Sequence, residues 1–137
     1  MHGRSPDILT AIDSAISSSG RTPDAVLSGD VHNYQRFSRT LNHREIPYIV
    51  AGAGGYANDA RSMHKLQKGI ELEKLPFQTT IKTLKLEKFQ QDQPGFLRVT
   101  VSPDTLGFEI LDRAVRRQRP LALRSFFYLM SRRRSGF

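Results

Sequence analysis

The sequence contains no cysteine and no tryptophan, and it has no apolar run near the length that crosses a bilayer. The lack of cysteine excludes disulfides and thiolate metal sites. A metal would therefore be held by histidine, carboxylate, amide or water ligands, which favours the harder divalent ions. A membrane span needs about 20 consecutive apolar residues, so none is predicted. The N-terminal segment lacks the apolar stretch of a signal peptide, and the compartment stays open, with the cytoplasm as the default.

Acidic residues are missing from positions 113–137, which contain eight arginines. These arginines account for the whole formal net charge of +8, so the first 112 residues are neutral overall. The high isoelectric point is thus a property of this tail and does not predict a nucleic-acid-binding body. Three interpretations of the tail stay open: a core-covering helix around residues 126–130, a basic helix that touches anionic lipid or nucleic acid, and a disordered end.

The length fits one domain with a hydrophobic core. A helix is predicted over residues 5–19, with Ser5 as N-cap, proline at the first helical position and Gly20 after the last turn. A short buried strand is predicted at residues 25–28 and a second apolar strand at 46–51. The alternating segments 96–101 and 106–111 flank a Ser-Pro-Asp-Thr turn and predict an antiparallel hairpin. Residues 79–89 fit either a strand or a helix.

Polar donors gather in residues 29–37, which follow the first predicted strand and are expected to form a loop. They include a carboxylate at Asp30, an imidazole at His32 and a guanidinium at Arg36. Ligands of α/β sheets bind at the carboxyl ends of strands, and Asp30 and His32 are spaced to reach adjacent divalent metals. Gly29 is expected to let the backbone turn tightly. The residues alone also allow an aspartate that caps backbone amides and a histidine bonded to a neighbour.

The segment 29–36 resembles the last signature of the calcineurin-like metallophosphoesterases, in the form found in their purple-acid-phosphatase-like branch. That signature runs Gly-His-x-His and often continues with a small residue or Asn, then Tyr, an acidic or amide residue, and Arg. The matching positions are Gly29, His32, Asn33, Tyr34, Gln35 and Arg36. Residues 19–27, 48–56 and 94–101 resemble other family segments in the same order. The resemblance covers roughly residues 1–112 and leaves out the tail at 113–137.

This resemblance implies a metal ligand at His32. It implies a second one at Asp30, which stands where the family has its first histidine. A carboxylate there favours oxygen-binding ions such as manganese or magnesium, or it marks a site that has lost function. The family's upstream ligand motifs do not occur in the sequence. The residues expected to orient ligands or contact substrate are Asn33, Tyr34, Arg36 and His2.

The remaining histidines and glycines have more than one interpretation. His2 either lines the substrate mouth or belongs to a disordered terminus. His43 and His64 are expected to be ordinary surface histidines with no reason to converge on His32. The glycines at 52, 54 and 55 either cradle a phosphate with their backbone amides or serve turn geometry.

The predicted fold class is α/β: the C-terminal part of a metallophosphoesterase αββα sandwich at residues 1–112, mostly β-strands with one N-terminal helix, and a basic helical or disordered tail at 113–137. The resemblance implies a fragment of a metal-dependent phosphoric ester hydrolase, incomplete and inactive alone, with Mn, Fe, Zn or Mg as cofactor. The alternative is a non-catalytic module that binds or oligomerises through its tail. The expected partners are a phosphate ester for the parent enzyme, further copies of the chain at open strand edges, and nucleic acid or an anionic surface at the tail.

Overall fold

The computed structural model describes residues 6–54, 63–112 and 126–131. Its first element is helix α1 (Pro6–Ser19), which confirms the predicted N-terminal helix. Asp7 lies in the first turn, where the positive end of the helix dipole favours an acid. Gly20 follows the helix with φ of 63°, the left-handed conformation that glycine readily adopts after a helix. The predicted N-cap Ser5 lies outside the described residues.

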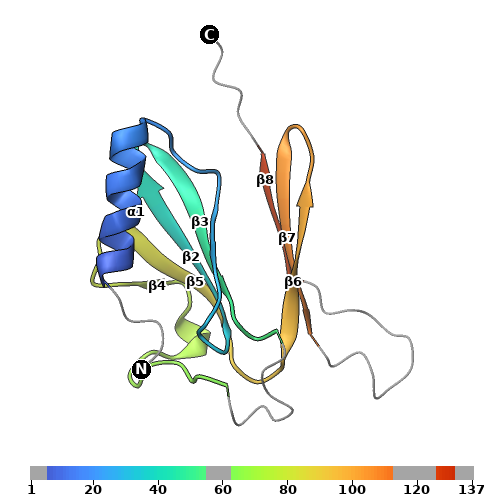
Figure 1. The fold of residues 1–137 in the computed structure, drawn as a ribbon. Coiled ribbons are helices and arrows are strands. Elements are labelled where there is room, and N and C mark those ends of the chain that lie inside the picture. The colour runs from blue at the N-terminus through green and yellow to red at the C-terminus, as the bar shows by residue number, and fades with distance from the viewer. Residues whose placement is uncertain (1–5, 55–62, 113–125, 132–137) are drawn as a thin grey trace.

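Five strands form the larger sheet in the order β1–β3–β2–β5–β4 (Figure 1). Their bounds are Val26–Ser28 for β1, Tyr34–Leu41 for β2, Arg44–Ala51 for β3, Phe77–Gln78 for β4 and Leu84–Gln90 for β5. β1 runs parallel to β3, and the other neighbours are antiparallel. The strands predicted at 25–28 and 46–51 are thus confirmed. β3 is buried in its middle, but β1 is not, because it lies at the sheet edge with Leu27 about half exposed.

Strand β2 occupies positions that the sequence predicted to be a polar loop. It pairs with β3 along its whole length, from Tyr34 opposite Ala51 to Leu41 opposite Arg44. The two strands are joined by Asn42 and His43, whose φ values are 48° and 60°. Two positive φ values in a two-residue turn match the twist of a tight hairpin, and asparagine tolerates this conformation. The loop after β1 is therefore confined to residues 29–33.

A β-bulge interrupts the pairing of β2 with β5. Arg36 pairs with Lys88 and the next residue, Phe37, pairs with Leu86, so β5 has one extra residue at Glu87. Such a bulge changes the alternation of side chains along the bulged strand. The segment 79–89, which the sequence left ambiguous, is a strand from Leu84 onward because its backbone continues the sheet beside β2. A 3-10 turn, η2 (Leu72–Lys74), precedes β4.

Three strands form the smaller sheet in the order β6–β7–β8. Strands β6 (Gly95–Val101) and β7 (Thr105–Asp112) confirm the predicted hairpin, and the N–H of Ser102 donates to the carbonyl of Thr105 across its turn at 2.9 Å. Glu109, which is buried, accepts from the Nε of Arg98 on the opposite strand at 2.8 Å. Opposite charges directly across an antiparallel pair stabilise the sheet.

The tail contributes the third strand, β8 (Phe126–Ser131), which pairs antiparallel with β7. The prediction of a helical or disordered tail is therefore wrong at these positions. A short run rich in aromatic residues fits a strand as well as a helix. Here β7 presents an edge of unpaired N–H and C=O groups, and pairing with β8 satisfies them. The arginines of the tail lie outside the described residues.

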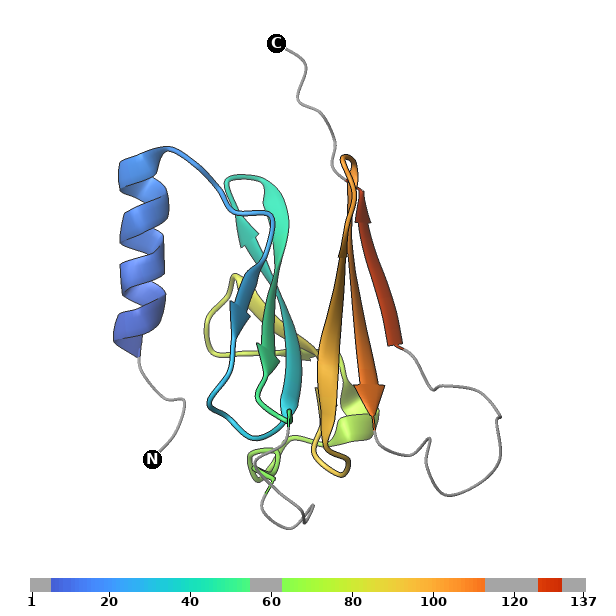
Figure 2. The same cartoon turned by 45° about the vertical axis from the view of Figure 1, so that its right-hand side comes forward.

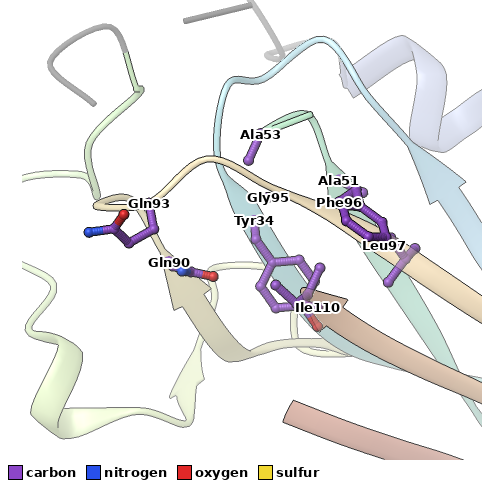
Figure 3. Close-up of a pocket in the computed structure, with 9 residues that line it drawn as sticks. All are labelled: Tyr34, Ala51, Ala53, Gln90, Gln93, Gly95, Phe96, Leu97 and Ile110. Atoms are coloured by element: carbon purple, nitrogen blue, oxygen red, sulfur yellow. The ribbon is translucent and has the colours of Figure 1, made fainter. Parts of the chain in front are cut away.

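The two sheets pack face to face, and α1 lies on the other side of the larger sheet (Figure 1, Figure 2). Tyr34, Ile49, Phe108 and Ile110 form the buried cluster between the sheets. Figure 3 shows the ring of Tyr34 beside Ile110, close to where β6 begins. The pocket drawn there has no charged side chain in its lining, so it does not suit an anionic ligand.

On its other side, the larger sheet is tied to α1 by a buried guanidinium. Arg39 of β2 is 4% exposed, and its Nη2 donates to Asp13 Oδ2 of the helix at 2.6 Å. Its Nη1 donates to the hydroxyl of Tyr48 at 3.2 Å. The molecule is thus a mixed α/β fold, mostly strands with one N-terminal helix, as the sequence predicted at this coarse level.

Candidate functional site

The candidate site begins at loop 29–33, which leaves the carboxyl end of β1. Within the loop the N–H of Val31 donates to the carbonyl of Gly29 at 2.9 Å, and the N–H of Asn33 donates to the carbonyl of Val31 at 2.7 Å. The left-handed position is Asp30, with φ of 67°. The expectation that Gly29 makes the turn is therefore wrong, because aspartate tolerates this conformation and takes it instead.

The loop packs against the end of β3 at Gly52. A Cβ atom at this glycine would lie 1.9 Å from the carbonyl oxygen of Val31, so no other residue fits without moving the loop. The N–H of Gly52 donates to the carbonyl of Asn33 at 3.1 Å. This contact brings together two of the segments that carry the family resemblance, residues 29–36 and 48–56. It also assigns Gly52 a packing role, one of the two interpretations that its sequence allowed.

Asn33 fixes the loop from the inside. It is 1% exposed, its Nδ2 donates to the carbonyl of His64 at 2.9 Å, and its Oδ1 accepts from Gln35 Nε2 at 3.0 Å. The side-chain oxygen of Asn33, one of its side-chain N–H groups and its backbone carbonyl are thus all hydrogen-bonded. A buried residue that is hydrogen-bonded in this way makes the chain around it rigid. Asn33 therefore holds its neighbour His32 in place. This position is compatible with the ligand-orienting role that the resemblance implies for Asn33.

His64 is the residue that the sequence interpretation missed. The prediction that it has no reason to converge on His32 is wrong: their ring centroids lie 4.8 Å apart with planes 11° from parallel. The backbone N–H of His32 donates to His64 Nδ1 at 3.0 Å, and the backbone N–H of His64 donates to the carbonyl of His32 at 3.0 Å. These reciprocal bonds join segments 32 residues apart. His43, in contrast, is an exposed residue of the β2–β3 turn, at the far end of β2.

The tautomer of His64 follows from this contact. A ring nitrogen that accepts a hydrogen bond has no proton, so the neutral imidazole of His64 must hold its proton on Nε2. That nitrogen is then a donor and has no lone pair for a metal. His64 in this arrangement supports the loop and suits an anion better than a cation.

Tyr34 and Arg36 lie on the opposite face of β2 from Asn33 and Gln35, because side chains alternate along a strand. Tyr34 belongs to the cluster between the sheets. Burial raises the pKa of its hydroxyl, and the charge of Arg36 opposes that rise. Arg36 lies beside its register partner Lys88, whose pKa is lowered by burial and then by the Arg36 charge. The structure thus separates the predicted substrate-contacting side chains onto two faces of β2.

A complete divalent-metal site needs several converging donors. Within residues 6–54, 63–112 and 126–131, no group of three or more His, Asp or Glu side chains is placed to hold a metal ion. Imidazole nitrogens bind metals in the ring plane, and the nearly parallel rings of His32 and His64 cannot both direct a lone pair at one ion. The described residues therefore offer His32 and the exposed Asp30 as donors but do not fit a whole metal site. His2 lies outside the described residues.

Comparisons with known proteins give no match: no family model fits the chain, and neither a curated protein nor a solved structure is significantly similar to it. Among the described residues, no helix is long and apolar enough to cross a membrane.

Proposed function

We propose that this chain is part of a metal-dependent phosphoric ester hydrolase of the metallophosphoesterase type. In this proposal, loop 29–33 contributes one edge of a divalent-metal site. The observation that carries the proposal is the contact between Gly52 and Val31. It joins the donor-rich loop to the glycine-rich segment, two segments that follow one another in the order that the resemblance implies. The layers of helix, larger sheet and smaller sheet agree with the C-terminal part of an αββα sandwich, which is also proposed here.

In this proposal His32 is a metal ligand and Asp30 a second donor, for Mn, Fe, Zn or Mg. Asp30 is exposed and His32 half-buried, so both are placed at the rim of the fold rather than inside its core. Two donors are fewer than the three or four protein ligands that an open catalytic site usually has. A single weakly held ion would position neither a nucleophilic water molecule nor a leaving group. The chain alone is therefore expected to be inactive, and the remaining ligands must come from elsewhere.

A non-catalytic module is the second candidate, and one observation favours it. Among the described strands β1 pairs with β3 alone, and apolar side chains on the edge strands β1 and β6 are exposed: Leu27 at 51%, Val99 at 39% and Val101 at 69%. Open edges and apolar patches are sites where chains associate. The basic tail through which this candidate would also bind a polyanion lies outside the described residues, apart from β8.

The experiment that tests the incomplete site is hydrolysis of p-nitrophenyl phosphate and bis-p-nitrophenyl phosphate with added manganese, zinc or iron. We expect turnover at background for the wild type and for His32→Ala alike. Metal-dependent turnover that His32→Ala abolishes and His43→Ala retains would contradict the incomplete site. It would show that a second copy or another arrangement completes the ligand set. Both candidates predict background turnover, so metal binding separates them: Mn²⁺ that leaves the NMR signals of His32 unperturbed would favour the non-catalytic module.

A further inference from the structure

On the face of the larger sheet that points away from the smaller sheet, apolar side chains form a wall close to loop 29–33. Phe37, Leu86 and Phe77 lie in register across β2, β5 and β4, so their side chains share one face. The bulge at Glu87 brings Phe89 to the same face, since it lines the same groove as Leu86 three residues earlier. Phe77, on the short edge strand β4, is 37% exposed. The wall therefore presents aromatic surface that the fold itself leaves partly open.

The other side of this groove is formed by residues 64–70, which cross the end of the sheet. This segment is held at one point by the bonds of His64 to the loop and at another by Leu66, whose N–H donates to Gln91 Oε1 at 2.6 Å. Lys65 is engaged by Asp92, with 3.6 Å between Nζ and Oδ1. Lys68 is exposed and makes no ion pair with any residue that the structure describes. The groove thus has an anchored polar rim with an ammonium group available.

The charges of the groove have one sign. Lys65 and Lys68 line it together with the neutral His64, and no aspartate or glutamate does, among the described residues. Val31, Asn33 and His64 line it too, and these residues also build or hold the candidate loop. An aromatic wall with a cationic rim suits a ligand that has a ring at one end and an anion at the other. The groove opens beside the loop, so such a ligand would have its anionic end near His32.

We propose that this groove binds the ring of an aryl or benzyl phosphate-type ester, with the ring against the phenylalanine wall and the anion at the His64–Lys68 rim. The proposal rests on the proposed function and narrows its substrate to esters with a planar apolar group. The ring would contact Phe77 and Phe89. The ammonium of Lys68 is a donor of the kind that phosphate oxygens accept.

The test is titration of the full chain with benzyl phosphonate, which cannot be hydrolysed, followed by amide and side-chain NMR shifts without added metal. We expect shifts confined to the residues of the groove. Phe77→Ala and Phe77→Leu should both weaken binding about fivefold or more, since an aromatic contact is lost in each. Lys68→Gln should weaken it about threefold or more. The matched control is Phe96→Ala, which removes a 60% exposed phenylalanine from the other sheet and should change nothing.

Two further arms decide what is recognised. Inorganic phosphate alone and benzyl alcohol alone should each bind at least fivefold more weakly than benzyl phosphonate. Inorganic phosphate lacks the aromatic ring, and benzyl alcohol lacks the anionic group. Equal binding of inorganic phosphate, shifts outside the groove, or unchanged affinity in Phe77→Leu would overturn the proposal. His43→Ala, in the exposed turn at the far end of β2, should leave metal-free binding intact. A failure in the groove is therefore distinguishable from a failure of the metal-site proposal, which is judged by His32 and metal alone.

Discussion

Gly52→Ala tests the packing that builds the candidate site. The new Cβ would meet the carbonyl oxygen of Val31 at 1.9 Å and its carbonyl carbon at 2.6 Å. The loop backbone must retreat by roughly 1.5 Å before an ordinary contact returns, which is overpacking that costs about 1–3 kcal/mol. The retreat also breaks the bond from Gly52 N–H to the buried Asn33, which leaves polar groups unpaired at a further cost of about 1–3 kcal/mol.

We therefore expect Gly52→Ala to lower the free energy of unfolding by about 2–5 kcal/mol, a large part of the roughly 5–15 kcal/mol of a typical domain. The entropy that alanine removes from the unfolded chain offsets only about 0.4–1 kcal/mol. Urea unfolding followed by circular dichroism measures the change. Gly29→Ala is the matched control in the same loop: its Cβ would meet nothing within 4 Å, so its cost should stay below about 1 kcal/mol. Equal costs for the two glycines would refute the account of the loop.

Three further predictions concern the body of the fold. Asp13→Ala leaves the buried Arg39 without its carboxylate and should lower the free energy of unfolding by about 2 kcal/mol. In a chain that already carries Arg39→Met, the same Asp13→Ala change should cost little more. A double-mutant cycle in urea measures this coupling between the two residues. Burial raises the pKa of Tyr34 above about 10, so its contribution to stability is present below that pH and lost as pH rises further. Tyr34→Phe should thus reduce the loss of stability as pH rises above about 10, and an unchanged slope would contradict this. The open edge at β1 and the exposed Leu27 predict an oligomer by analytical ultracentrifugation at micromolar concentration, which a monomer at every concentration would disprove.

The elements that the sequence predicted correctly are those with local signals. Pro6 and Asp7 begin α1 and Gly20 ends it, and each acts within one turn of its own position. The β6–β7 hairpin alternates around a turn whose Ser102 bonds to Thr105 three residues later. Such signals depend on neighbours along the chain, so they can be recognised without knowing what packs against them.

Strand β2 could not be predicted in this way because neither of its faces is apolar by composition. Its buried Arg39 is hydrogen-bonded to Asp13 of α1 and to Tyr48 of β3, which are contacts made only in the folded chain. β8 has a similar reason: a short aromatic run fits two conformations, and the free edge of β7 decides between them. Tertiary structure overrides local preference at both strands.

In the candidate site, too, some features have a local sequence signal and others depend on tertiary contacts. His32 stands out in the sequence because its position fits a signature that the segment resembles, and Asp30 because it stands at a ligand position of that signature with a different donor. The contact of His32 with His64 has no sequence signal, since 32 residues separate the two and His64 lies in a polar stretch. The need for glycine at position 52 likewise has no sequence signal, because it depends on the carbonyl of Val31 in loop 29–33 lying against Gly52. Candidate donor residues could therefore be singled out from the sequence, and their metal role stays a prediction, but the contacts that support the loop could not be predicted.

The most direct test of the central claim is a Mn²⁺ titration of the chain followed by broadening of the histidine side-chain NMR signals. If loop 29–33 is one edge of a metal site, the signals of His32 should broaden first, and His32→Ala should remove the effect on the neighbouring loop amides. The matched control is His43, an exposed histidine at the other end of β2, which should broaden only at much higher Mn²⁺. Equal broadening of His32 and His43, or an unperturbed loop at millimolar Mn²⁺, would contradict a metal-ligand role for this loop.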